Sequence, residues 1–203
     1  AAEGQDFVMA CVGNDNDLRE VTLGANGAFA GMGKGKVFVD HTTASAEIAR
    51  ELYAAAKKGG FDFIDAPVSG GDIGARNGTL TIMVGGEASA LEKVMPVFQA
   101  MGKTITHVGD SGAGQVAKAA NQIMVAAQMV AMGELLVFSK KAGVDPRKVV
   151  DAIKAGAAQC WTLDVKPPRL FDGNCNPGFK AHMQLKDLNI ILETAREYDI
   201  PVS

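Results

Sequence analysis

A single lysine, Lys118, stands near the start of a long, mostly apolar segment, Ser111 to Phe138. On a helix, Gln115, Asn121 and Gln122 fall beside it, one turn before or after. A polar stripe on a buried helix is costly unless its groups are paired or face a cavity. Burial and the positive end of the helix dipole both lower the pKa of an amine, so a lysine here can exchange protons near neutral pH. The alternative is a side chain that extends past the helix end into solvent.

The second stretch that could do chemistry is DAPVSGGDIGARNGTL, residues 65–80. Pro67 is expected to end a strand, after which Ser69, Gly70 and Gly71 leave backbone N–H groups uncovered. Glycines let a ligand approach the backbone closely, and successive amides can hold an anion. With the Ser69 hydroxyl, this turn suits a small carboxylate. The alternative is a plain glycine turn between two elements.

The composition is typical of a globular chain and excludes several classes of function. Hydrophobic residues make up 47% and charged residues 21%, and the net charge is -3. No basic cluster is present, which argues against nucleic acid as a partner. The three cysteines lack the spacing of metal ligands, so neither a metal site nor a disulfide framework is predicted, and a cytoplasmic location is the simplest interpretation. Polar residues interrupt the long apolar segment, so no membrane span is predicted.

Strand and helix signals alternate along the first half of the chain. Apolar strands are expected at 6–12, 37–41, 61–69, 79–86 and 104–109, with helices between them. This alternation predicts a mostly parallel sheet, in which ligands bind at the carboxyl ends of the strands. After Gly109 only helix signals follow. We therefore predict an α/β domain over residues 1–109 and an all-α domain over residues 110–203, joined through the long helix.

Three stretches occur in one order along the chain: DAPVSGG with GTL, VGDSGAGQVAKAANQ, and PGFKAHMQLKDLNIILETA. Together they resemble the β-hydroxyacid dehydrogenase family, which includes 3-hydroxyisobutyrate dehydrogenase and tartronate semialdehyde reductase (2-hydroxy-3-oxopropionate reductase). The resemblance covers essentially the whole chain. It implies a Rossmann-like dinucleotide-binding domain followed by a helical domain. It also implies hydride transfer between NAD or NADP and a short-chain β-hydroxyacid or 2-hydroxy-3-oxo acid.

The same resemblance assigns roles to individual residues. It makes Lys118 the catalytic general acid/base. It implies a small-molecule carboxylate as substrate, bound by Ser69, Gly70 and Gly71 and bordered by Asn121 and Gln122. The residues that it places along the cofactor cleft are Val12, Gly13, Thr43, Phe179 and Lys186.

The chain also departs from the family. Val12-Gly13 stands where relatives have Leu-Pro, and Thr42-Thr43 stands where they have Ser-Thr or Ser-Ser. His41, before these threonines, is interpreted as a rim residue more readily than as a second acid/base. The family's opening strand, G-x-G-x-x-G turn and helix, which hold the pyrophosphate, are not in the sequence. We therefore expect a fragment that lacks both ends, including the residue that separates NAD from NADP.

Two other functions stay open at this point. A non-catalytic binding or scaffold member of the same fold would be expected to have lost Lys118. An enzyme like 6-phosphogluconate dehydrogenase would carry a His-Asn pair where this chain has Asn121-Gln122, and an Arg/Lys cluster for the phosphate. Exposed apolar faces of the long helix predict self-association into a homo-oligomer.

Overall fold

The computed structural model describes residues 1–202. Its strands are β1 (Phe7–Ala10), β2 (Val37–Asp40), β3 (Asp62–Asp65), β4 (Val68–Ser69), β5 (Leu80–Gly85) and β6 (Gly102–Gly109). Its helices are α1 (Asp15–Leu23), α2 (Ala46–Gly59), α3 (Gly71–Arg76), α4 (Ala88–Met101), α5 (Ala113–Lys141), α6 (Pro146–Ile153), α7 (Trp161–Phe171) and α8 (Ala181–Glu197), with one 3-10 turn, η1 (Ala28–Gly31). The strand expected at 61–69 ends before Pro67, as predicted, but the sequence predicted neither the short strand β4 after Pro67 nor α3. This ending follows because proline has no N–H for a strand ladder.

The strands form one sheet in the order β1-β2-β3-β5-β4, with β6 also paired to β5. The pairs β1–β2, β2–β3 and β5–β6 are parallel, as the sequence predicted. The pairs β3–β5 and β4–β5 are antiparallel, which was not predicted. Only the short α3 separates β4 from β5, and such a connection is too short for the crossover that parallel neighbours need.

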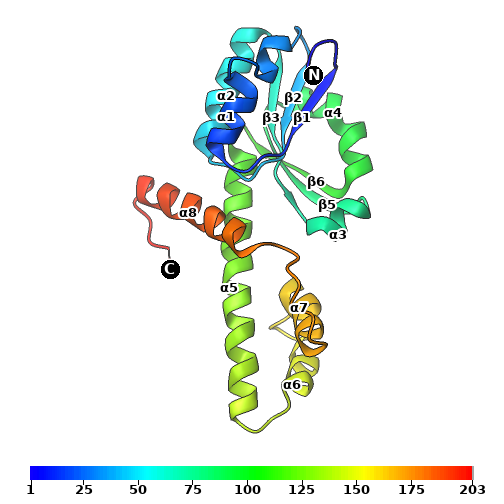
Figure 1. Cartoon of the computed structure of the whole chain (residues 1–203), viewed down its shortest axis with the longest axis vertical. Coiled ribbons are helices and arrows are strands. Elements are labelled where there is room, and N and C mark those ends of the chain that lie inside the picture. The colour runs from blue at the N-terminus through cyan, green and yellow to red at the C-terminus, as the bar shows by residue number, and fades with distance from the viewer. Residues whose placement is uncertain (203) are drawn as a thin grey trace. The chain divides into compact units, whose positions relative to one another are not determined.

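Helices cover both faces of this sheet, with α1 and α2 on one face and α4 on the other (Figure 1). Successive residues of a strand point to opposite faces. Accordingly Phe38 packs with Leu18 and Leu52 of α1 and α2, whereas Val39 packs in the cluster that holds Val94 of α4. All four residues of β2 are buried, as is typical of a strand covered on both sides.

Short polar side chains fix where three of the helices begin. Asn14 and Ser45 cap α1 and α2 by accepting hydrogen bonds from backbone N–H groups of the first turn. Asp145 does the same for α6, which starts with Pro146. These oxygens satisfy N–H groups that have no partner within the helix.

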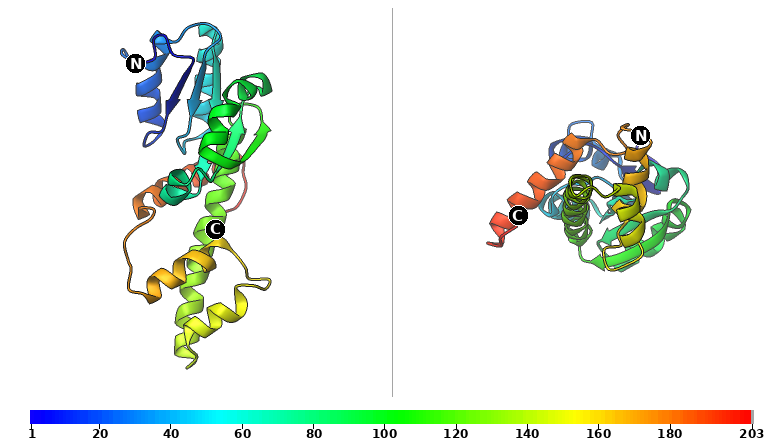
Figure 2. Two further views of the ribbon diagram at one scale, coloured as in Figure 1. Left: turned by 90° about the vertical axis from the view of Figure 1, so that its right-hand side faces the viewer. Right: turned by 90° about the horizontal axis from the view of Figure 1, so that it is seen from below.

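The chain packs as two compact units. The first contains residues 1–120 together with the chain from 181 onward, and the second contains residues 121–180. In the second unit, α6 and α7 lie beside α5 and run obliquely to it (Figure 2), and Thr162 Oγ1 donates a hydrogen bond of 3.0 Å to Gln128 Oε1. The predicted domains, 1–109 and 110–203, follow the change from strands to helices instead, and this division stays a prediction.

Part of the apolar surface of α5 is exposed, as the predicted self-association requires. Val130 and Val137 are both 62% exposed, and Phe138 is 76% exposed. By length and composition alone, α5 could also cross a membrane, although its polar residues had argued against a span. Core helices of water-soluble proteins meet the same criterion, so this observation is weak evidence for a membrane.

Candidate active site

The side chain of Lys118 is buried within the first unit. Only 8% of the residue is exposed, and its Nζ donates a hydrogen bond of 2.8 Å to the carbonyl oxygen of Val68. The alternative of a lysine that extends into solvent is therefore wrong. Burial lowers the pKa of Lys118; the carboxylate of Asp187 opposes this, and the ammonium of Lys186 lowers the pKa further. The amine thus has the surroundings expected of a group that exchanges protons.

The predicted carboxylate-binding turn follows directly on the Lys118 contact. Val68 and Ser69 form β4, whose pairing with β5 fixes the turn to the sheet. Gly70 and Gly71 have φ angles of +132° and +63°, which residues with a side chain rarely adopt. A Cβ atom on Gly71 would meet no heavy atom within 4 Å, so the space beside this residue is open. The structure therefore places the amine next to a turn with exposed backbone.

The predicted cofactor contacts of the first unit lie at one edge of the sheet. Val12 and Gly13 follow β1, and Thr43 follows β2, its parallel neighbour. The N–H of Val12 donates a hydrogen bond of 3.0 Å to Thr42 Oγ1, which joins the two loops. From α8, the ammonium of Lys186 donates to the Thr43 carbonyl. Three segments that are distant in sequence thus meet here.

The other predicted site residues belong to the second unit. Asn121 Nδ2 donates a hydrogen bond of 2.7 Å to Gln122 Oε1, and Gln122 is buried. Phe179 precedes α8 and is 49% exposed. The roles of these three residues stay predictions.

Sequence reasoning missed two buried carboxylates that end neighbouring strands, Asp40 of β2 and Asp65 of β3. The Asp65 carboxylate accepts hydrogen bonds of 2.8 and 3.0 Å from the backbone N–H groups of Gly112 and Gln115, at the start of α5. Burial raises the pKa of Asp65, against the effect of these bonds, and raises the pKa of Asp40 to about 7. An acidic residue at the end of an apolar strand could have signalled this, because carboxylates are seldom buried without partners.

His41 lies at the carboxyl end of β2 but is buried. Its Nδ1 lies 2.7 Å from the Ala66 carbonyl oxygen, and its ring packs against Phe98. Burial lowers the pKa of this imidazole. The neutral ring therefore supports the loop between β3 and β4.

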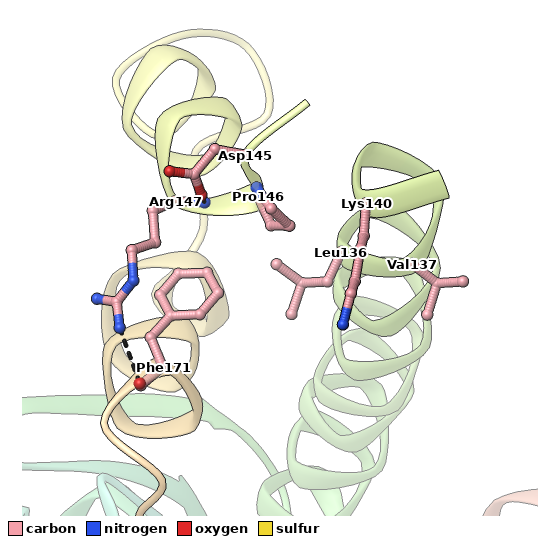
Figure 3. A pocket seen from close by; sticks show the side chains of 7 residues that line it. All are labelled: Leu136, Val137, Lys140, Asp145, Pro146, Arg147 and Phe171. Atoms are coloured by element: carbon pink, nitrogen blue, oxygen red, sulfur yellow. Dashed lines mark hydrogen bonds between the residues drawn. The ribbon is translucent and has the colours of Figure 1, made fainter. Parts of the chain in front are cut away.

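A separate hollow of about 370 Å³ lies in the second unit (Figure 3). Its polar groups are largely occupied with one another. Arg147 donates a hydrogen bond to the Phe171 carbonyl and stacks over the Phe171 ring, and the Asp145 carboxylate accepts from the Arg147 N–H. Because it contains none of the predicted site residues, we assign no chemistry to this hollow.

Comparison with known proteins agrees with this arrangement. Residues 1–109 match the family profile described as the NAD binding domain of 6-phosphogluconate dehydrogenase. Residues 112–203 match the profile described as NAD-binding of NADP-dependent 3-hydroxyisobutyrate dehydrogenase. Both descriptions give NAD or NADP as the cofactor of these domains.

Individual relatives extend the match over the whole chain. An uncharacterized oxidoreductase of Shewanella frigidimarina is 45% identical over 97% of this chain and 67% of its own length. The 2-hydroxy-3-oxopropionate reductase of Escherichia coli is 42% identical over 96% of this chain and 66% of its own length. The chain thus spans about two thirds of the length of these curated relatives.

A solved structure gives the same result for the fold. The 3-hydroxyisobutyrate dehydrogenase of Mycobacterium tuberculosis, solved with L-serine, superposes with a TM-score of 0.90 at 30% identity, over 99% of this chain and 70% of that one. The Rossmann-like α/β part and the helical part both have counterparts there. The chain therefore belongs to the β-hydroxyacid dehydrogenase family, the NAD(P)-dependent oxidoreductases of the 3-hydroxyisobutyrate dehydrogenase and 2-hydroxy-3-oxopropionate reductase type.

Proposed function

We propose that the full natural protein transfers a hydride between NAD(P) and a short-chain β-hydroxyacid or 2-hydroxy-3-oxo acid, with Lys118 as the general acid/base. The observation that carries this proposal is the buried amine of Lys118, held by the Val68 carbonyl immediately before Ser69. The names of the relatives from Escherichia coli and Mycobacterium tuberculosis support a small hydroxyacid or oxo acid as substrate.

Lys118 would move the proton that accompanies the hydride. In reduction, its ammonium donates a proton to the carbonyl oxygen of the substrate; in oxidation, its neutral amine accepts the hydroxyl proton. Such transfer by a positioned side chain contributes about 10²–10⁴-fold to the rate. The N–H groups of Ser69, Gly70 and Gly71 would hold the substrate carboxylate and so fix its distance from the amine. Asn121 and Gln122 would border the substrate.

The cofactor, when bound, supplies or accepts the hydride. The residues proposed to hold its nicotinamide end are Val12, Gly13, Thr43, Phe179 and Lys186. Those of the first unit fit, because loops after neighbouring parallel strands are where such sheets bind dinucleotides. The stretch GAGQVA that opens α5 resembles a phosphate-binding turn, but Asp65 already accepts the N–H groups of Gly112 and Gln115. Pyrophosphate binding is therefore not assigned to that stretch.

A Lys118→Ala change in the full natural chain tests the proposal. Turnover should fall about 10²–10⁴-fold, while NADH or NADPH affinity, measured by fluorescence titration, stays close to that of the unaltered protein. Lys103→Ala is a control, because Lys103 is exposed on β6. Turnover near normal in Lys118→Ala would overturn the proposed role.

A substrate panel with both cofactors separates this proposal from the two alternatives. A scaffold protein would turn over no member of the panel. The buried Lys118, whose pKa is lowered by burial, argues against the scaffold alternative. An enzyme like 6-phosphogluconate dehydrogenase prefers the phosphorylated sugar acid.

We also propose a cytoplasmic homo-oligomer, since the exposed apolar residues of α5 are unfavourable in water. Light scattering that shows only a monomer would contradict the proposed homo-oligomer.

A further inference from the structure

We propose that Gln115 is a positioning residue that fixes the position of Lys118 relative to the loop that carries the candidate cofactor contact Thr43. The inference rests on the proposed role of Lys118. Gln115 lies in the first turn of α5, one helical turn before Lys118, and is 2% exposed. A buried amide side chain needs partners for its donor and its acceptor.

The side chain of Gln115 forms hydrogen bonds to the backbone of the residues on either side of Thr43. Its Nε2 donates a hydrogen bond of 2.8 Å to the carbonyl oxygen of Thr42, and its Oε1 accepts one of 3.1 Å from the N–H of Ala44. The same Nε2 lies 3.5 Å from Asp40 Oδ2. The backbone on each side of Thr43 is therefore fixed by one side chain of α5.

The backbone of Gln115 is tied to a different strand. Its N–H donates a hydrogen bond of 3.0 Å to the carboxylate of Asp65, at the end of β3. Three residues further along α5, Lys118 reaches the Val68 carbonyl, in the segment that follows β3. Gln115 thus joins the loop after β2 to the start of α5, and rotation or translation of that turn would move the Lys118 amine relative to Thr43.

The amide of Gln115 satisfies both partners at once, because it carries a donor and an acceptor. Methionine has a similar length but neither donates nor accepts strongly, so it leaves the Thr42 carbonyl and the Ala44 N–H without partners. An ionised carboxyl can accept but not donate. A protonated carboxyl has one O–H donor, for the Thr42 carbonyl, and one carbonyl acceptor, for the Ala44 N–H, whereas the amide has a second N–H that faces Asp40.

The test compares Gln115→Met and Gln115→Glu with the unaltered full natural chain. Gln115→Met should lower kcat by about 10²-fold across the pH range, because displacements on the order of 1 Å at a reacting group have effects of that size. Gln115→Glu should keep near-normal kcat at acid pH and lose it as the introduced carboxyl ionises. Asp40 of β2, Asp65 of β3 and Asp15 of α1 are acidic groups facing this region. The cations are Lys118 on α5 itself and Lys186 of α8, which donates to the Thr43 carbonyl. The unaltered protein supplies the reference pH profile.

Hydrogen exchange of the backbone amides in residues 42–46 is the second readout. Gln115→Met should speed this exchange, and Gln99→Met, on the exposed side of α4, should not. If Gln115→Met misfolds, the comparison of Gln115→Glu at acid and alkaline pH decides the question within one folded protein. Lys118-dependent turnover that neither Gln115 variant changes would overturn this inference alone. Absence of hydroxyacid turnover in the unaltered protein would instead overturn the proposed function, and this inference with it.

Discussion

The Nζ of Lys118 lies 2.8 Å from the carbonyl oxygen of Val68. An ammonium and a neutral amine can both donate a hydrogen bond to a carbonyl, so this contact holds the side chain in either protonation state. A carboxylate in the same place would favour the charged form and raise the pKa. The contact therefore positions the amine while burial keeps its pKa low.

The pH dependence of the reaction should reflect the lowered pKa of Lys118. Reduction needs the ammonium, so kcat/KM for reduction should fall as the pH rises through the pKa of Lys118, which lies below 10.5. Because oxidation needs the neutral amine, kcat/KM for oxidation should rise over the same pH range. Asp187 raises this pKa, so Asp187→Asn should move both profiles to lower pH. Profiles in both directions, from about pH 5 to about pH 10, check this. Unmoved profiles in Asp187→Asn would contradict it.

Asp40 should make the folded protein less stable as pH rises. Its pKa is about 7 in the folded state against an ordinary value of 3.8, so between these values the folded state binds a proton that the unfolded state does not. The contribution of Asp40 to the free energy of unfolding is then fully present below pH 3.8. It is lost as pH rises toward 7, by up to about 1.4 kcal/mol per pH unit. Asp40→Asn should flatten this slope in urea denaturation. An unchanged slope counts against the assignment.

The sequence was sufficient to predict most of the strands and helices, because their signals are local, but it did not predict β4 and α3. The alternation of buried strands and the caps Asn14, Ser45 and Asp145 each depend on neighbouring residues. The lysine and the glycine turn were also visible as types and spacings. The antiparallel β3–β5 pair and the bonds from Gln115 to Thr42 and Ala44, more than 70 positions away, depend on how distant segments pack. No local pattern encodes such contacts.

Gly71 should be needed for substrate binding more than for stability. Gly71→Ala introduces a Cβ with free space but at φ +63°, where a side chain costs about 1–2 kcal/mol. Gly173→Ala is a matched control, with φ +72°, the same open space and a place in the second unit. Both changes should lower the melting temperature similarly, but only Gly71→Ala should raise KM for the acid substrate. A similar KM in both variants would show that the turn does not hold the carboxylate.

Two glycines of α5 should respond in opposite ways to the same added methyl group. A Cβ on Gly114 would lie 2.6 Å from the carbonyl oxygens of Asp65 and Met83, because the start of α5 packs directly on β3 and β5. Gly114→Ala must therefore shift the turn that carries Gln115, and we expect a loss of stability of about 1–3 kcal/mol together with a loss of turnover. A Cβ on Gly133 would meet nothing within 4 Å, so Gly133→Ala should stabilise the helix by roughly 0.5–1 kcal/mol and leave turnover unchanged. Chemical denaturation and steady-state kinetics of the two variants measure both effects. Equal stability of the two variants would mean that the first turn of α5 is not held against the sheet.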